Sequence, residues 1–270
     1  LSSRLPKTAL ACGADIVVQS THKTLPAFTQ GAMLHVQGNR VDLDKLKFML
    51  RLHQTSSPSY IIMAGLELAV TIYSDHGSLL MEGLLQNIEE FTQGVKSINS
   101  IDLLIEARGK YTTYYKDPTK LHFSIKKHGL TGLRVEEHLR RSFNVQMELS
   151  NISSILGIAS IANDQEDFNG LLRGLESLDR LLVKDIDVKY SQICYPRAKA
   201  KLRPREALYK DKKNVPLDLA IGRISGEYVI PYPPGIPLLI PGEVITEEII
   251  QYIKTSNKAG INIVGLKDKE

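Results

Sequence analysis

The spacing of apolar residues changes partway along this 270-residue chain, and the change limits the folds that it can adopt. In the first part apolar side chains recur at helical spacing, every three or four residues. After Gly109 apolar and polar residues alternate instead, which predicts half-buried strands between helices. The clearest helical run is Leu80, Leu84, Ile88, Phe91, Val95 and Ile98, and the first alternating run is Leu121, Phe123 and Ile125.

Local signals predict the other elements of the first part. Runs of β-branched residues beside glycine indicate strands, and an aspartate or a proline marks where a helix begins. The apolar face of the longest helix suits a dimer or interdomain seam, although ordinary packing within its own domain is favoured. We expect strands at residues 16–18 and 31–36, helices from Asp42 or Asp44 to Leu52 and over residues 61–73, and a separate longer helix over residues 80–98.

The second part predicts a small α+β domain. Segments in which apolar and polar residues alternate indicate strands, and two helical segments lie among them. The resulting order, β-α-β-β-α, suits a sheet with its helices on one face. The expected elements are a strand over residues 121–125, a helix from Thr131 to Phe143, strands over residues 145–149 and 152–161, and a helix over residues 164–183.

Composition argues against several classes of protein. The net charge is +4, which alone does not indicate nucleic-acid binding. Eight basic residues lie between Arg197 and Lys213, but only Tyr195 and Tyr209 accompany them as stacking platforms. A solvated linker is therefore favoured over an anion or nucleic-acid patch, and we expect no nucleic-acid partner.

Membrane, disulfide and metal sites are not expected either. No apolar run approaches the roughly 20 residues that cross a bilayer. Cys12 and Cys194 lie far apart in sequence, which predicts two free thiols in a reducing cytoplasm. The seven histidines show no metal-binding spacing, so no metal ligand is assigned.

The segment Ser20-Thr21-His22-Lys23 follows a β-rich run and carries the strongest chemical signal. A hydroxyl, an imidazole and an amine lie within four positions, where a strand gives way to a loop. A pyridoxal phosphate enzyme needs such a layout, because a lysine amine forms a Schiff base with the cofactor aldehyde while short polar neighbours hold its phosphate. Taken alone, the tetrapeptide favours a solvated surface lysine.

Three segments together resemble the bacterial ornithine/lysine/arginine decarboxylases, which are pyridoxal phosphate enzymes with the aspartate aminotransferase fold. They occur in the family's order and span nearly the whole chain, which makes the resemblance specific. The segments are residues 13–35 (GADIVVQSTHKTLPAFTQGAMLH), residues 53–60 (HQTSSPSY), and the pair 222–227 (GRISGE) and 231–243 (PYPPGIPLLIPGE).

The resemblance implies roles for individual residues. Lys23 matches the Schiff-base lysine, and Ser20 and His22 match contacts to the cofactor phosphate. Ser57 matches a further phosphate contact and Thr55 a residue near the substrate, on a loop that the family contributes from the partner subunit. The sequence has Gln54-Thr55-Ser56 where relatives often carry a run of threonines, so the individual roles in this loop stay open.

Glu148 is the expected contact to the side chain of the substrate. On a strand it would point away from the apolar face that Val145 and Met147 share. By resemblance, a glutamate in this region faces the cationic tail of the substrate, and a carboxylate suits an ammonium or guanidinium group. A solvated strand glutamate is an equally supported interpretation.

By resemblance, the chain is an α/β protein that forms the C-terminal part of a fold-type I pyridoxal phosphate large domain, with a mostly parallel sheet, followed by a smaller α+β C-terminal domain. We place these at residues 1–110 and 111–270. The expected activity is decarboxylation of arginine, lysine or ornithine to a polyamine-type amine, in a cytoplasmic homodimer or higher oligomer. An upstream portion would complete the cofactor site. The alternatives are a non-catalytic cofactor-binding or dimerisation module and a related aminotransferase.

Overall fold

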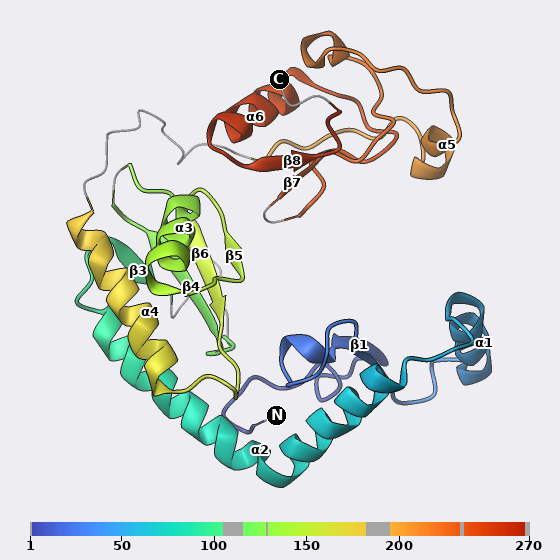
Figure 1. Ribbon diagram of the computed structural model, residues 1–270. Helices are drawn as coiled ribbons and strands as arrows, with labels where there is room; N and C mark the ends of the chain where they lie inside the picture. Colours follow the sequence, from blue (N-terminus) through green and yellow to red (C-terminus); the bar gives the residue numbers. More distant parts are fainter. Residues whose placement is uncertain (1, 105–115, 128, 182–194, 233–234, 268–270) are drawn as a thin grey trace. The chain divides into compact units, whose positions relative to one another are not determined.

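The computed structural model describes residues 2–104, 116–127, 129–181, 195–232 and 235–267 (Figure 1). The chain divides into two compact units. The first comprises Leu1–Ser97, Leu103–Leu121 and Ile158–Leu172, and the second comprises Ile98–Asp102, His122–Gly157 and Arg173–Glu270. The domain boundary expected between residues 110 and 111 lies outside the described residues, so that division stays a prediction.

Two strands of the first unit form a hairpin-like pair. β1 (Ile16–Ser20) and β2 (Ala32–Val36) occur where the sequence predicts strands, and they pair antiparallel. The mostly parallel sheet expected here is therefore not built by the described residues of this unit. A parallel pair needs a crossover of about a dozen residues or more, usually a helix. Residues 21–31 contain only a short 3-10 turn, so the chain reverses direction instead.

Two helices follow in the first unit. Asp42 caps α1 (Leu43–His53) as predicted, and its carboxylate accepts hydrogen bonds from the backbone N–H groups of Asp44 and Lys45 at 3.1 and 3.0 Å. The prediction of two separate helices after Pro58 was wrong, because residues 60–95 form one continuous helix, α2 (Tyr60–Val95). Gly77 lies inside this helix and is buried against the ring of Tyr73, which lies four residues earlier in the same helix.

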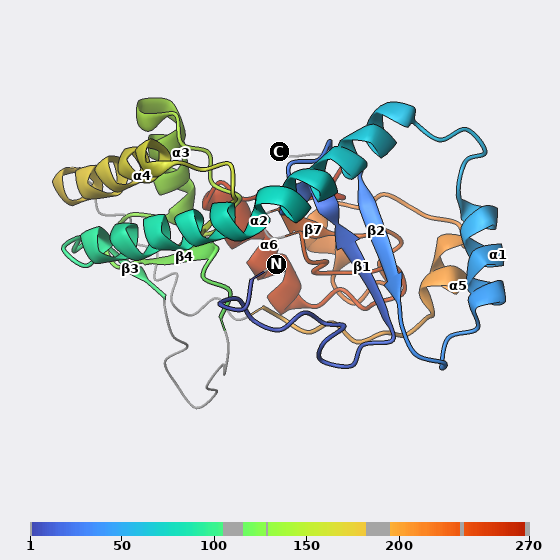
Figure 2. The ribbon, with the colours of Figure 1, turned by 90° about the horizontal axis from the view of Figure 1, so that it is seen from below.

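The two halves of α2 differ in burial. Leu84, Ile88, Phe91 and Val95, on the face predicted from the apolar spacing, are at most 5% exposed. The N-terminal half runs beside β1 and β2 (Figure 2), where Leu66 lies against Gly31. That half nevertheless leaves large apolar side chains at the surface, namely Tyr60, Ile61, Met63, Leu68 and Val70.

A four-stranded sheet lies mainly in the second unit. Its strands are β3 (Ile101–Leu103), β4 (Lys120–Ile125), β5 (Leu149–Ser150) and β6 (Ser154–Ile158), in the order β3-β4-β6-β5. The helices are α3 (Gly132–Phe143) and α4 (Gln165–Ser177), with the 3-10 turn η2 (Leu178–Arg180) after α4. The predicted order β-α-β-β-α is thus confirmed by β4, α3, β5, β6 and α4.

Caps and packing fix the boundaries of these elements. Thr131 caps α3 as predicted and accepts a hydrogen bond from the backbone N–H of Arg134 at 3.3 Å. The strand expected over residues 145–149 is reduced to β5, because only Leu149 and Ser150 form the ladder with β6. The helix expected through residue 183 changes to the 3-10 turn η2 after Ser177, and residues 182–183 lie outside the described chain.

The C-terminal part of the second unit has a core of its own. β7 (Ile230–Tyr232) pairs antiparallel with β8 (Asn262–Val264), and α6 (Glu247–Lys258) contributes Ile249 and Ile253 to the core cluster. The short helix α5 (Pro204–Leu208) and the 3-10 turn η4 (Leu217–Ala220) precede them. The basic side chains from Arg197 to Lys213 are exposed, but the segment is not a free linker, because it contains α5 and the backbone N–H of Lys201 donates to the Gly242 carbonyl at 2.9 Å.

Features of two other kinds are absent from the described part of the chain. None of its helices combines the length and the apolar character that a membrane span requires. No group of three or more His, Cys, Asp or Glu side chains within it is placed to hold a metal ion.

Candidate active site

The four-residue segment predicted to hold the cofactor lies at the end of β1. Ser20 is the last residue of the strand and pairs with Ala32 of β2. The next three residues, Thr21 to Lys23, form the 3-10 turn η1. The Thr21 carbonyl accepts hydrogen bonds from the backbone N–H groups of Thr24 and Leu25, at 3.2 and 2.9 Å. The strand thus gives way to a tight turn that holds the hydroxyl, imidazole and amine together.

The side chains of this segment differ in exposure. Ser20 and Lys23 are exposed, and His22 is half-buried. Thr21 is only 5% exposed, and its hydroxyl has no hydrogen-bond partner in the described part of the chain. The described residues therefore leave the Lys23 amine open to solvent, while one buried hydroxyl beside it is unpaired.

His22 is oriented by a backbone carbonyl. Its Nδ1 lies 2.9 Å from the carbonyl oxygen of Gly31, which also accepts the Thr21 N–H at 3.1 Å. This arrangement occupies one ring nitrogen and leaves Nε2 for a ligand. Sequence reasoning did not identify Gly31, because a backbone acceptor leaves no signature in the residue type.

A strained turn holds this carbonyl in place. The Gly31 N–H donates to the Phe28 carbonyl at 3.2 Å and closes a turn in which Gln30 has a φ of 78°. That φ lies in the left-handed region, which is costly for a residue with a side chain. A Cβ at Gly31 would lie 2.8 Å from a methyl carbon of Leu66, so a larger residue here would require the Leu66 side chain to move.

Thr55 and Ser57 lie on the exposed connection between α1 and α2. The Thr55 hydroxyl accepts a hydrogen bond from the Ser57 N–H at 3.4 Å, while Ser59 provides the N-cap of α2. Among the described residues, neither side chain makes a hydrogen bond with Ser20, His22 or Lys23. Their expected roles, contributed to a partner subunit, stay predictions.

Glu148 lies in a bend just before β5. The sequence had suggested a position within a strand. Its side chain is exposed, and its backbone N–H donates to the Leu156 carbonyl at 2.9 Å, which extends the ladder with β6 by one bond. The expected contact to the substrate tail is not tested by this position and stays a prediction.

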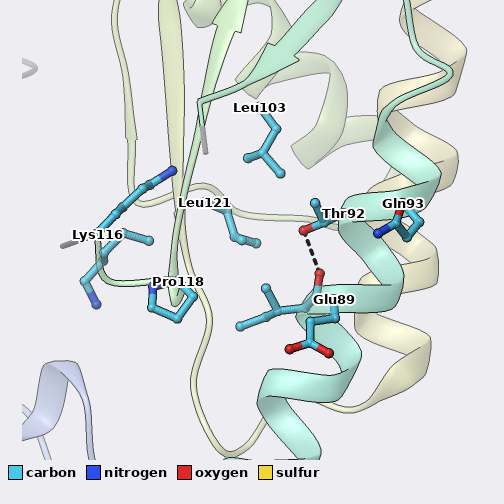
Figure 3. A pocket seen from close by; sticks show the side chains of 9 residues that line it. Glu89, Thr92, Gln93, Leu103, Lys116, Pro118 and Leu121 are labelled. Carbon is cyan, nitrogen blue, oxygen red and sulfur yellow. Dashed lines mark hydrogen bonds between the residues drawn. The ribbon is translucent and has the colours of Figure 1, made fainter. Parts of the chain in front are cut away.

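A separate hollow lies in the first unit between α2 and the residues around β3 and β4 (Figure 3). It has a volume of about 270 Å³ and is lined by apolar side chains including Ile88, Leu103 and Leu121, with the polar Thr92 and Lys116 among them. Partial burial lowers the pKa of the Lys116 ammonium. None of the residues expected to hold cofactor or substrate lines this hollow.

Family models match both ends of the chain. The model described as the Orn/Lys/Arg decarboxylase major domain matches residues 3–113, and the C-terminal domain of the same family matches residues 187–269. Together these two matches cover more than half of the chain, and both belong to one family.

Individual relatives agree with the family models. The chain is 36% identical over 267 residues to an arginine decarboxylase of Bacillus subtilis, and 32% identical over 270 residues to one of Bacillus anthracis. Each alignment covers 98% of this chain and 54% of the relative. The chain therefore spans about half the length of these curated relatives.

Solved structures give the same fold. A lysine decarboxylase of Francisella novicida superimposes with a TM-score of 0.75 at 22% identity, covering 93% of this chain and 47% of that one. The constitutive lysine decarboxylase of E. coli gives a TM-score of 0.76 at 19% identity, covering 93% and 48%. With the family models and the curated relatives, these matches show that the chain belongs to the Orn/Lys/Arg decarboxylase family.

Proposed function

We propose that this chain carries the cofactor lysine of a pyridoxal phosphate-dependent decarboxylase of a basic amino acid. The observation that carries the proposal is the turn η1, which follows β1 directly and holds the Ser20 hydroxyl, the His22 imidazole and the Lys23 amine within four residues. The family membership reported above supports the reaction class.

The donor set fits a phosphate-bearing aldehyde. Ser20 offers a hydroxyl donor and His22 keeps Nε2 available, because Gly31 occupies Nδ1. Lys23 is exposed and provides the amine that reacts with an aldehyde. When bound, pyridoxal phosphate supplies the electron sink that allows the substrate to lose carbon dioxide.

The remaining assignments belong to the same proposal. Ser57 binds the phosphate and Thr55 lies near the substrate, on a loop shared across a homodimer or higher oligomer. The carboxylate of Glu148 attracts the cationic tail of the substrate. This charge pairing holds the reacting bond of the substrate in position. Residues 1–110 belong to the cofactor domain and residues 111–270 to the C-terminal domain. An upstream portion completes the site in the cytoplasmic enzyme.

Arginine is the substrate that we would test first. The curated relatives with the highest identities given above are named arginine decarboxylases, whereas the lysine decarboxylase of E. coli K12 is 23% identical over 338 residues. Arginine, lysine and ornithine all carry a cationic tail that a carboxylate such as Glu148 can pair with. The amine product would then be agmatine, cadaverine or putrescine respectively.

Reductive labelling tests the cofactor assignment directly. The protein, expressed together with its upstream sequence, is incubated with pyridoxal phosphate and reduced with borohydride, and the modified peptide is mapped by mass spectrometry. We expect the label on Lys23, and we expect Lys23→Ala to abolish both the label and carbon dioxide release from arginine.

Lys7→Ala is the matched control, because Lys7 is an exposed lysine of the same unit and should leave labelling unchanged. A label on another lysine, or none, would refute the assignment of Lys23. Labelling of Lys23 without carbon dioxide release from any of the three amino acids would favour the non-catalytic cofactor-binding module.

A further inference from the structure

The contact between His22 and Gly31 determines where the proton of the imidazole lies. A carbonyl oxygen can only accept a hydrogen bond, so His22 Nδ1, at 2.9 Å from it, must carry a hydrogen. A neutral imidazole has a single N–H, and its other nitrogen is an acceptor. Nε2 of neutral His22 therefore presents a lone pair, not a donor, to any ligand beside it.

The surrounding structure keeps the ring from exchanging its two nitrogens. The Gly31 carbonyl is fixed by the Thr21 N–H on one side and by the turn from Phe28 to Gly31 on the other. Leu66 of α2 lies against Gly31. Rotation of the ring would lose the Nδ1 hydrogen bond at a half-buried position, which is unfavourable.

A phosphate dianion also has only acceptor oxygens. If a phosphate oxygen lay next to Nε2 of a neutral His22, the nitrogen lone pair and the negative oxygen would repel each other, because no proton would lie between them. We propose that binding of the cofactor phosphate is coupled to the uptake of one proton at His22, which becomes an imidazolium donating through both ring nitrogens. This inference rests on the proposed function, because it takes His22 as a phosphate contact.

Few other titratable groups lie on the elements around His22. Lys23 is on η1 itself, His35 is on β2, and Glu67 follows Leu66 on α2. His35 pairs with Val17 in the ladder, three rows from the Ser20–Ala32 pair beside η1. In the described part of the chain, none of these three groups makes a hydrogen bond or an ion pair with His22.

The experiment counts protons taken up on binding. The probe is pyridoxine 5′-phosphate, which has an alcohol in place of the aldehyde and so excludes the reaction with Lys23. The titration is run at about pH 8, where a free phosphate monoester is a dianion because its second pKa is near 6. Calorimetric titration in two buffers with different heats of ionisation gives the proton number.

His22→Gln separates the contact from the proton, because a glutamine amide donates to phosphate without titrating. We expect the wild-type protein to take up about one proton more than His22→Gln. His35→Gln is the matched control and should leave the wild-type number unchanged. Equal uptake by the wild type and His22→Gln would overturn the inference.

Nitrogen-15 spectra of histidine-labelled wild-type protein report the protonation of each ring nitrogen without any substitution of His22. The spectrum of His35→Gln helps to assign the signals. We expect Nδ1 to be protonated throughout and Nε2 to gain a proton when the probe is added. A bare Nε2 in the bound state would overturn the inference while labelling of Lys23 would still uphold the proposed function. Absence of any Lys23 label with pyridoxal phosphate would end both.

Discussion

At the scale of single residues, the backbone of Gln30 is strained next to the candidate site. Its left-handed conformation costs about 1–2 kcal/mol for a residue with a Cβ, which exceeds the entropic cost of glycine, roughly 0.5–1 kcal/mol. We therefore expect Gln30→Gly to raise the free energy of unfolding by about 0.5 kcal/mol. Urea denaturation measures the change.

Thr29 of the same turn is the control for this prediction. It is exposed and does not have a positive φ, so Thr29→Gly should lose about 0.5–1 kcal/mol through chain entropy alone. If both glycine variants were destabilised equally, the strain assigned to Gln30 would be absent.

Two buried threonines differ in what their hydroxyls do. Thr21 and Thr131 are each 5% exposed, but the Thr21 hydroxyl is unpaired in the described chain whereas Thr131 caps α3. Thr21→Val removes an unsatisfied polar atom, so we expect unchanged stability or a gain of up to about 1 kcal/mol. Thr131→Val should lose about 1 kcal/mol. Thermal unfolding of both variants measures the difference. If Thr21→Val were destabilised as much as Thr131→Val, the Thr21 hydroxyl would have a hydrogen-bond partner.

At the scale of elements, the sequence predicts caps better than it predicts connections. Asp42 and Thr131 were identified because a capping side chain acts within three residues of its own position. The continuity of α2 was missed because the apolar spacing is interrupted between residues 73 and 80, although a helix continues through polar residues that face solvent. The Gly31 carbonyl was missed because the direction of a backbone carbonyl cannot be read from the residue type.

The exposed surface of α2 offers a stability test. A Cβ at Gly83 would meet nothing within 4 Å, and this glycine is an exposed residue inside the helix. Gly83→Ala should therefore stabilise the protein by about 0.5–1 kcal/mol. Gly94→Ala should gain less or lose stability, because its Cβ would lie 2.7 Å from a methyl carbon of Leu172. Equal gains in urea denaturation would contradict the packing described for Gly94.

Asp179 joins the turn before β3 to the end of α4 and η2. Hydrogen bonds from Ser100, with one from the backbone N–H of Asn99, hold the pKa of this carboxyl below its ordinary value of 3.8, and the nearby Lys127 adds to the effect. A lowered carboxyl pKa contributes stability that is present above the unfolded value and lost as the pH falls through the folded value.

We therefore expect Asp179→Asn to cost about 1 kcal/mol at neutral pH, a modest figure because the side chain is exposed. The difference from wild type should shrink as the pH is lowered below 3.8. Unfolding by urea over a series of pH values measures it, and a difference that is independent of pH would rule out the carboxylate as its cause.

At the scale of the whole molecule, the first unit leaves much apolar surface uncovered in the described chain. Val18 of β1 is 73% exposed, Leu52 of α1 is 63% exposed, and Ile61 of α2 is 72% exposed. Large exposed apolar side chains in this number are typical of surfaces that other protein covers. The chain also spans only 54% of its Bacillus relatives, so the sequence in hand predicts the fold of these elements but not what covers them.

The uncovered surface predicts how the chain behaves by itself. We expect the chain expressed alone to bind a fluorescent apolar dye strongly. The double variant Val18→Thr, Ile61→Thr should bind less of it, because both side chains belong to the exposed apolar surface that the dye contacts. Co-expression with the upstream sequence should lower dye binding of the unaltered chain. Weak dye binding by the chain alone would show that these faces are covered within it.

The unbroken length of α2 has a consequence for the loop at its start. A helix turns by about 100° per residue, so the rotation about its axis between one end and the other is set by the number of residues between them. Inserting one residue at the exposed Gly83 would swing the loop that carries Thr55 and Ser57 through that angle about the axis, relative to the half that is anchored by Phe91. The direction of that loop therefore depends on the number of residues in α2 and on the bend that α2 makes along its length (Figure 1).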